Sequence, residues 1–394
     1  MSGTHKRKRA LIVLNCGLSV PSATVRALQY RPHFDRSPDW SAEFVSRKSE
    51  RWTYWANRTH QPGVPGVVPL VHRPLARGAA AWERRQEDAI VRQAAQFDLV
   101  YLVKMPHLRL YRRLRDLAGP RVVMDLNDGL WLPAFQAHEW RDLDALLTTA
   151  NGVICENDHV AGYARRHNAR VTVVPDSPQV EVFDRWRGEV RRNPNQIVLG
   201  WIGGAENVGA LYRVLEPLEA LFARHPQLHL RVVGASPSHL PRFESVRCSC
   251  LPAYNQEQMV REALAFDIGL FPMFHNGDGL ARGTLKAMIY MSAGATVIAE
   301  NYGENPSLIQ DGVNGVLAAN PEEWLQKLDW LVTHPQERAA IARRGLETIR
   351  GRFTAERVFQ QLTAAFDLMM AGGPEVAPAP SQPAISGAAG SIVS

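Results

Sequence analysis

Short apolar runs alternate with segments of helical periodicity along the first half of the chain. Residues 10–15 (ALIVLN) and 97–105 (FDLVYLVKM) are apolar runs of strand length, whereas residues 82–96 (WERRQEDAIVRQAAQ) repeat their apolar positions with a helical period. Further strands are predicted at RVVMDL, GVICEN and RVTVVP, each following a helix-like segment. Strands that alternate with helices over short connections run parallel, so the first half is predicted to be a parallel sheet with crossover helices. From about residue 36 to 80 the chain is rich in tryptophan and proline, and the pattern there indicates irregular structure.

The same alternation begins again at Ile197, after a polar, proline-marked stretch. Strands are predicted at IVLGWI, LHLRVV, RCSCLP, DIGLFPM and TVIAE, and helices at about 321–333, 335–349 and 355–371 close the chain. Two such units in succession predict an α/β protein with two Rossmann-like domains that face a cleft. The predicted parts are a basic tail (1–9), a first domain (10–180), a linker (181–196), a second domain (197–371) and a disordered tail rich in Pro, Gly, Ala and Ser (372–394).

The charge balance narrows the class of partner. A formal net charge of +6 suits anionic partners such as phosphorylated donors or an acidic membrane surface. No nucleic-acid-binding module accompanies the charge, so nucleic acid is not an expected partner. No stretch approaches the roughly 20 apolar residues that span a bilayer. We expect a cytoplasmic protein, with peripheral contact to the inner face of the membrane as an open alternative.

The four cysteines predict neither a metal site nor a disulfide framework. Two of them, Cys16 and Cys155, lie in or beside apolar strand-like runs, where free thiols are commonly buried. Cys248 and Cys250 are expected to point to opposite faces of a strand, which would keep them from sharing a zinc ion. A reduced protein without structural metal is therefore expected.

Two features of the second half indicate an anion site. Gly203 and Gly204 end a strand just before a helix, so the backbone can approach a phosphate, although a simple tight turn would look the same. Arg282 and Lys286 stand one turn apart at the predicted start of the helix after DIGLFPM. Two cations at a helix N-terminus are unfavourable unless an anion is bound, and the alternative is a solvated basic turn. We predict that these four residues hold a diphosphate.

The second half resembles the nucleotide-sugar glycosyltransferases of the GT-B fold, of the group 1 type. The resemblance lies in LGWIGGAENVGAL, in FDIGLFPMFHNGDGLARGTLKAMIYMSAGATVIAENYGENPSLIQDGVNG and in the helical segment that follows; the first half is similar more loosely. It implies a donor bound mainly by the second domain, an acceptor bound mainly by the first, and no cofactor or tightly bound metal. It also implies transfer of a hexose, usually with retention of configuration, without an enzymic nucleophile.

One departure from that family concerns the donor ribose. Most such enzymes carry two glutamates with seven residues between them, and the second holds the ribose hydroxyls. The matching positions here are Ala281 and Ile289. Ribose contacts are therefore expected to shift to Glu304 or Glu300, or donor binding is altered.

Further candidates follow other predicted strands. At Glu304 and Asn305, in YGENPSLIQDG, backbone N–H groups and the Glu304 carboxylate are expected to face the cleft and bind the donor, although a helix cap with a nearby acid is common. In the first domain Gly17, Ser19 and Arg26 are candidate cleft residues, with a loop glycine and a surface arginine as the plain alternative. The candidate catalytic groups are Asp128 as an acceptor-side base, or else a turn residue, and His107 after the strand 97–105.

Three functions remain open on the sequence alone. The leading one is transfer of a hexose to a hydroxyl of a sugar, lipid or small-molecule acceptor. A degenerate, non-catalytic GT-B binding protein would explain the missing glutamates, and a GT-B sugar-nucleotide epimerase is a further alternative. Acceptor choice would lie in the irregular 36–80 region, where Trp52, Tyr54, Trp55 and Arg58 could line a groove or rest on a membrane.

Overall fold

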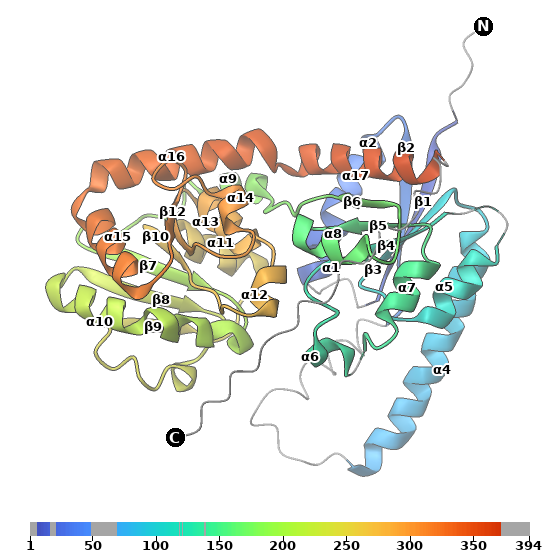
Figure 1. Ribbon diagram of the computed structural model, residues 1–394, viewed down its shortest axis with the longest axis horizontal. Helices are drawn as coiled ribbons and strands as arrows, with labels where there is room; N and C mark the ends of the chain where they lie inside the picture. The colour runs from blue at the N-terminus through green and yellow to red at the C-terminus, as the bar shows by residue number, and fades with distance from the viewer. Residues whose placement is uncertain are drawn as a thin grey trace, which may run out of the picture.

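The computed structural model describes residues 6–15, 21–48, 69–117, 119, 121–137 and 139–371. Within them the chain forms two six-stranded sheets whose strands are all parallel (Figure 1). In spatial order the first sheet holds β2 (Trp40–Ser46), β1 (Lys8–Leu14), β3 (Leu99–Val103), β4 (Arg121–Leu126), β5 (Gly152–Cys155) and β6 (Val171–Val173). The second holds β12 (Val316–Ala318), β11 (Thr296–Glu300), β10 (Ile268–Phe271), β7 (Ile197–Ile202), β8 (Leu228–Val233) and β9 (Cys248–Leu251). The predicted α/β class with two Rossmann-like sheets is confirmed.

Helices cover both faces of the first sheet, because its central strands β1, β3 and β4 are apolar on both sides. One face packs against α4 (Pro69–Ala94), α5 (Leu108–Arg115), α7 (Leu143–Thr149) and α8 (Asp158–Ala164). The other packs against α1 (Pro21–Arg26), α2 (Arg31–Arg36) and α17 (Ala355–Met370). The remaining elements of this part are a 3-10 turn, η1 (Leu28–Tyr30), and the short helix α6 (Pro133–Gln136).

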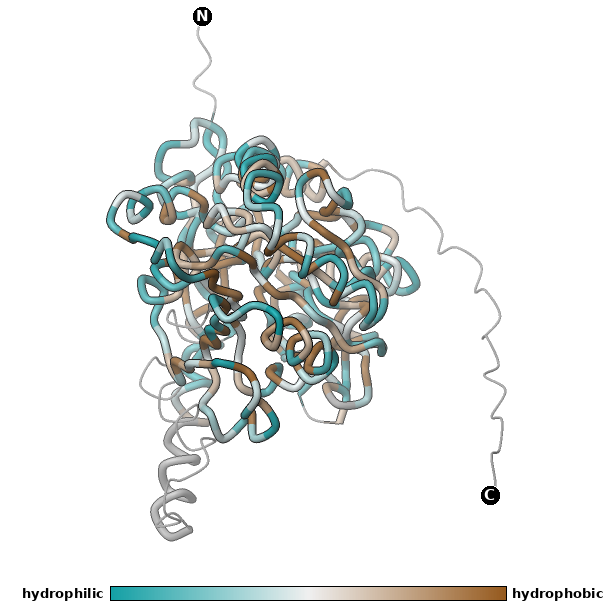
Figure 2. Tube along the Cα trace, turned by 90° about the vertical axis from the view of Figure 1, so that its left-hand side faces the viewer, coloured by the Kyte–Doolittle hydropathy of each residue, from teal (hydrophilic) through white to brown (hydrophobic). Residues whose placement is uncertain are grey.

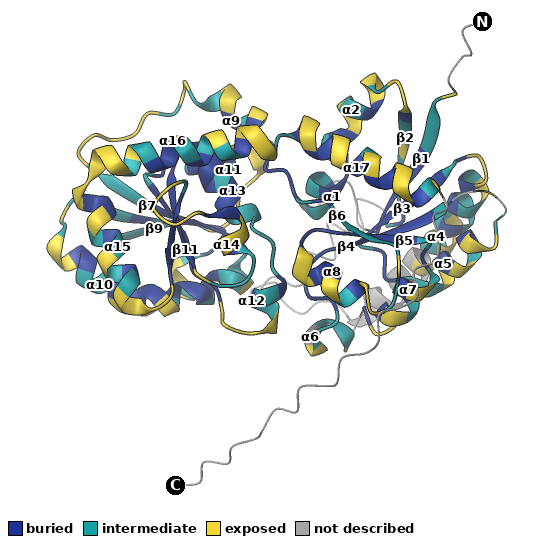
Figure 3. Ribbon diagram, turned by 45° about the horizontal axis from the view of Figure 1, so that its top comes forward, coloured by how far each residue is buried: buried dark blue, intermediate teal, exposed yellow. Residues whose placement is uncertain are grey.

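The second sheet is covered in the same way. One face packs against η2 (Ala205–Val214), α10 (Leu215–Arg224) and α15 (Pro321–Thr333), and the other against α9 (Val180–Trp186), α11 (Gln256–Leu264), α13 (Leu285–Ala293) and α16 (Pro335–Arg352). Shorter pieces are η3 (Pro237–His239), α12 (Gly277–Ala281) and α14 (Asn305–Leu308). Viewed along the long axis, apolar residues lie mostly toward the inside of the molecule and polar residues toward its outside (Figure 2), and most strands are buried while the outer helix faces are exposed (Figure 3).

The structure adds regular elements to the stretch from 36 to 80 that the sequence indicated as irregular. Residues 40–46 form β2, which pairs in parallel with β1, and α4 begins at Pro69 instead of near residue 82. Trp40 explains part of this, since its side chain is 1 % exposed and packs 5.3 Å from the Phe366 ring of α17. That contact joins residues far apart in the sequence, and a local pattern does not contain it.

The chain crosses between the two sheets twice. The predicted linker 181–196 is partly helical, and α9 buries Phe183 among residues of the second domain. The predicted second domain, 197–371, ends in α17, which packs on the first sheet through Phe366, 5.3 Å from the Tyr101 ring. The last helix therefore returns to the first domain because its apolar face completes that core.

Cys248 and Cys250 were expected on opposite faces of their strand, and that expectation is wrong. Both pack against the same apolar cluster, because residues two apart in a strand share a face. No group of three or more metal-ligating side chains occurs among the residues that the structure describes. A search of the same residues finds no helix with the length and apolar character needed to cross a bilayer.

Candidate functional site

The second sheet has a topological switch point between β7 and β10. From β7 the chain continues to β8 on one side, and it later returns to place β10 on the other side. Loops diverge at the carboxyl ends of two such strands, and open α/β sheets bind their ligands there. Gly203 and Gly204 follow β7 directly, so the structure places them at this point.

Lys286, the second residue of α13, reaches the same point. Its Nζ lies 4.6 Å from the ring of Trp201 in β7 and 5.6 Å from the ring of Phe271 in β10. It makes no hydrogen bond or ion pair with any other residue in the described part of the chain. Burial, with a smaller contribution from Arg282, lowers the pKa of Lys286 to about 7. A cation held without a partner at a helix start is favourable only when an anion joins it.

The glycines leave room for such an anion. A Cβ at Gly203 would stand 2.8 Å from Lys286 Nζ and 2.7 Å from the Trp201 ring. Gly203 also donates its N–H to the Val233 carbonyl of β8, at 3.0 Å, which fixes the loop. Three predicted residues, Gly203, Gly204 and Lys286, are thus brought together.

Arg282 departs from its predicted position. The helix begins at Leu285, so Arg282 does not share it with Lys286; it ends α12 in an extended conformation. Its guanidinium is paired with Asp278, 2.7 Å away. The reason is local, because Asp278 lies four residues earlier, within reach across one helical turn. Arg282 is still close enough to lower the pKa of Lys286.

Ala281, which stands where the resemblance would place the first glutamate, lies at the contact between the two domains. Ala281 is completely buried and packs within the core of the first domain. A Cβ at Gly129 would lie 2.9 Å from the Ala281 Cβ, and Asn157 Nδ2 donates to the Ala281 carbonyl at 3.3 Å. This position serves contact between the domains, and a longer acidic side chain would not fit there.

Of the two predicted donor residues after β11, only Glu304 lies between the domains. Its Oε1 accepts from the His159 backbone N–H at 3.3 Å. Asn305 is 1 % exposed and turns inward, donating from Nδ2 to the Glu300 carbonyl at 2.9 Å. The side chain of Asn305, a predicted donor-binding residue, is therefore turned away from the cleft, because its amide satisfies buried backbone.

Arg26 is likewise internal. Its side chain is 3 % exposed and forms ion pairs with Asp125 at 2.7 Å and with Asp176 at 2.9 Å. Tyr101 also donates to Asp125, at 2.6 Å. The guanidinium of Arg26 bonds to these buried groups and does not face the cleft, so the prediction of Arg26 as a cleft residue is wrong. Gly17 and Ser19 lie outside the described residues.

Asp128 belongs to a charged group at the carboxyl ends of β3, β4 and β5. Lys104 Nζ lies 2.8 Å from its Oδ2, and its backbone N–H donates to Glu156 Oε1 at 2.8 Å. Burial alone would raise the pKa of Asp128, but the ion pair and hydrogen bond from Lys104 outweigh it and lower that pKa. Burial, followed by the nearby Asp176 and Asp128, raises the pKa of Glu156. One carboxyl is thus held ionised beside another that favours its proton.

His107 lies between β3 and α5, directly before the helix, and carries a neutral imidazole at neutral pH. Burial, followed by the charges of Arg47 and Lys48, lowers its pKa to about 4. It can therefore accept a hydrogen bond but does not store a proton.

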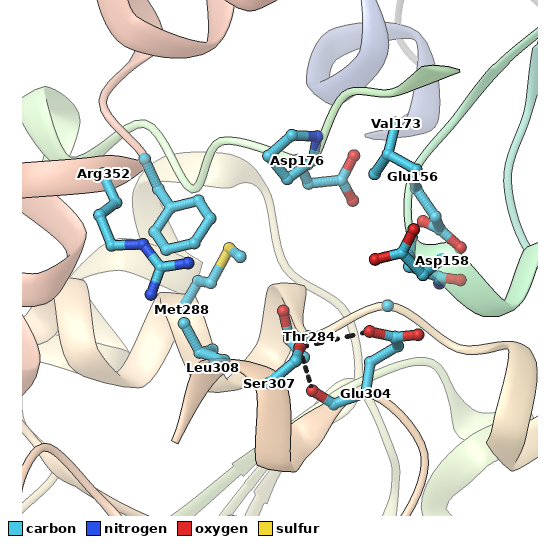
Figure 4. Close-up of a pocket in the computed structure, with 14 residues that line it drawn as sticks. Glu156, Asp158, Val173, Asp176, Thr284, Met288, Glu304, Ser307, Leu308 and Arg352 are labelled. Atoms are coloured by element: carbon cyan, nitrogen blue, oxygen red, sulfur yellow. Dashed lines mark hydrogen bonds between the residues drawn. The ribbon is translucent and has the colours of Figure 1, made fainter. Parts of the chain in front are cut away.

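A cavity of about 240 Å³ lies between the domains (Figure 4). Glu156, Asp158 and Asp176 line it from the first domain, and Glu304 and Ser307 from the second. Sequence reasoning missed Glu156, although an acid directly after the buried run GVIC is the same signal that singled out Asp128. Lys286 and Gly203 do not line this cavity, so the anion site and the acidic cavity are separate parts of the site region.

The comparisons agree with this architecture. Residues 213–364 match a family model described as glycosyl transferase-like. A D-inositol 3-phosphate glycosyltransferase of Actinosynnema mirum is 27% identical over 234 residues, which cover 54% of this chain and 55% of the relative. The match thus spans little more than half of that relative's length.

Solved structures of similar fold cover nearly the whole chain. Anabaena HepE, in complex with UDP and glucose, superposes with a TM-score of 0.65 at 17% identity, covering 92% of this chain and 100% of that one. Sucrose-phosphate synthase from Thermosynechococcus elongatus gives 0.64 at 15% identity, covering 93% and 100%. Within residues 213–364 the chain is therefore similar to glycosyl transferase-like proteins, and over nearly its whole length it shares the fold of these glycosyltransferase structures, with two facing Rossmann-like domains.

Proposed function

We propose that the protein transfers a hexose from a nucleotide-sugar donor to an acceptor hydroxyl, with retention of configuration. One observation carries this proposal: Lys286 is an unpaired, half-buried cation beside Gly203 at the switch point of the second sheet. A leaving diphosphate would supply the missing negative charge, and Lys286 would stabilise it without a metal ion.

UDP is the first nucleotide to test, because HepE was crystallised with UDP and with UDP-glucose. Glu304, at the rim between the domains, is a candidate for sugar or ribose hydroxyls. Arg282 would contribute through its charge while it remains paired with Asp278.

On the acceptor side, Asp128 and His107 would orient the hydroxyl instead of removing its proton fully. The Lys104 ion pair makes Asp128 a weak base, and His107 is neutral. In a retaining transfer without an enzymic nucleophile, a strong base is not required. The acceptor would be a sugar, a lipid or another small molecule that enters between the domains.

The test is calorimetric titration with UDP, GDP and ADP, combined with nucleotide release from the matching glucose donors. Lys286→Ala should weaken binding of the preferred nucleotide about 10- to 100-fold, as expected for loss of a charge-assisted hydrogen bond. Arg343→Ala removes an exposed cation of the same domain and should leave affinity unchanged.

The outcomes separate the alternatives. Binding without donor turnover in the presence of acceptors would favour a degenerate binding protein. Interconversion of the donor sugar without transfer would favour an epimerase. If no nucleoside diphosphate binds, or if Lys286→Ala binds as tightly as the wild type, the site assignment fails.

A further inference from the structure

We propose that the outward faces of α4 and α5 form a docking surface for an anionic lipid bilayer. The surface, called the arginine surface below, consists of six exposed side chains: Arg84, Arg85 and Arg92 of α4, and Arg109, Arg112 and Arg115 of α5. The proposal concerns where the protein resides and does not depend on the proposed transfer.

The two helices that carry the arginine surface are adjacent to each other. They lie side by side at the edge of the first domain that is remote from the second domain (Figure 1), and an ion pair of 2.9 Å joins Arg113 to Asp88. On α5 the apolar residues Leu110, Tyr111 and Leu114 are buried against the sheet. The arginines between them therefore point outward, and the exposed side of the helix is visible in Figure 3.

The positive charge of the arginine surface is not neutralised by acidic side chains of the described residues. None of the six arginine side chains makes an ion pair or hydrogen bond with another residue of the described chain. The acids of α4 are engaged elsewhere: Glu83 and Glu87 bind Arg47 of the loop after β2, at 2.6 and 2.8 Å. Asp88 is occupied by Arg113. Between residues 80 and 117, all of which the structure describes, Asp116 just after α5 is the one exposed acid without an ion-pair partner, so the arginine surface remains strongly cationic.

The side chains of the arginine surface and its surroundings favour an anionic membrane over a nucleic acid as the partner. Trp82, on α4 beside Arg84, is 37 % exposed, and tryptophan next to arginine is typical of residues at a lipid headgroup layer. Single-stranded nucleic acid is held by several stacking aromatics along a groove, whereas Trp82 is the one exposed large aromatic in the described side chains of these helices. Arginines distributed over two adjacent helices can each approach an anionic lipid headgroup of the same bilayer surface.

The test is co-sedimentation of the full chain with vesicles, without donor or acceptor. The probes are vesicles of phosphatidylcholine and vesicles with about 30% phosphatidylglycerol, each at about 50 mM and about 300 mM salt. Binding is expected only with phosphatidylglycerol, and more weakly at high salt. Equal binding to both vesicle types, or binding that salt does not change, would overturn the proposal.

The variant Arg109→Gln/Arg112→Gln/Arg115→Gln should reduce the vesicle partition constant at least tenfold, because each arginine near an anionic surface contributes about fivefold. Glutamine keeps helix propensity close to that of arginine. The control Arg191→Gln/Arg343→Gln/Arg357→Gln removes three exposed arginines that lie elsewhere and should bind like the wild type.

The variants keep the basic N-terminus, so a difference reports the arginine surface alone. Should the α5 variant fail to fold, Arg84→Gln/Arg85→Gln/Arg92→Gln in α4 gives the same measurement. Equal losses in surface and control variants would show simple dependence on net charge and refute the surface. Tight binding to duplex DNA with none to vesicles would also refute it.

Discussion

The carboxyl ends of the two sheets carry similar charged side chains, and one of them, Lys286 in the second domain, lacks among the described residues the ionic partner that Arg26 and Lys104 have in the first. In the first sheet Arg26 is neutralised by Asp125 and Asp176, and Lys104 by Asp128. In the second sheet Lys286 has no ionic partner in the described chain. Both sheets are parallel and helix-covered, so the difference arises from local pairing and not from the fold.

This contrast separates two uses of a buried charge. A cation matched by carboxylates holds elements of the protein together, and its removal is felt as lost stability. A cation left unmatched keeps its charge for a ligand, and its removal is felt as lost affinity. The contrast supports the proposal that a donor diphosphate binds at the second sheet, where Lys286 lies.

The largest effect is expected from removing Arg26, the cation that is paired with carboxylates in the first domain. Arg26→Leu leaves Asp125, which is 0 % exposed, without its main cation, and should lower the free energy of unfolding by about 3–5 kcal/mol. Urea denaturation measures it. Arg165→Leu, which removes an exposed pair with Asp158 in the same domain, should lose less than about 1 kcal/mol. Similar losses in both variants would contradict a structural role for Arg26.

A second experiment tests the backbone on the unpaired side. Gly234 has φ +99°, and a Cβ there would collide with the Gly203 carbonyl oxygen. Gly234→Ala should therefore lower the free energy of unfolding by about 1–3 kcal/mol and also weaken UDP binding, because the Gly203 loop must move. Gly162→Ala, in α8 with open space at its Cβ, should instead stabilise by about 0.5–1 kcal/mol. Unchanged UDP affinity in Gly234→Ala would remove the loop from the site.

The unpaired lysine also predicts a pH dependence of binding. Its pKa in the free protein is about 7, so the cation is present below pH 7 and is lost as the pH rises. A bound diphosphate favours the protonated form, and UDP affinity should therefore fall up to about tenfold per pH unit above 7. Titrations from about pH 7 to 9 avoid protonation of the phosphate itself. Lys286→Arg should flatten this slope, and a wild type without it would argue against Lys286 as the ligand.

The smallest expected effect concerns the contact that joins the two sides. Asn157 caps α8 by accepting from the Val160 N–H at 2.8 Å, and it also donates to the Ala281 carbonyl of the second domain. Asn157→Ala should lower the free energy of unfolding by about 1 kcal/mol. Asn157→Ser keeps a capping oxygen and isolates the contact between domains, so its loss should be smaller. An equal loss in thermal denaturation of the two variants would mean that the cap contributes nothing.

Apolar periodicity was enough to predict the fold class and most of the strands. It failed at β2, because Trp40 and its neighbours are stabilised by α17, more than 300 residues later in the chain. Because of the same long-range contact, α17 packs on the first domain, whereas the sequence had placed it in the second. Such pairings depend on which apolar faces meet, and a local pattern does not encode that.

The candidate site divides along the same line. Residue type and position at strand ends were sufficient to single out Gly203, Gly204 and Lys286, because parallel strands bring their carboxyl ends together. The partners of each charge were not predictable. Arg282 meets Asp278, Arg26 meets two aspartates, and Asn305 turns inward to buried backbone.

The sequence by itself therefore determined two Rossmann-like units and the edge of each sheet where chemistry is placed. Only the tertiary structure decided which charges are neutralised and which remain for a ligand. The physical reason is that an ion pair forms across a few ångströms of space, between residues that the chain separates by 99 positions for Arg26 and Asp125. Lys286 differs from Arg26 in its surroundings and not in its local sequence signal.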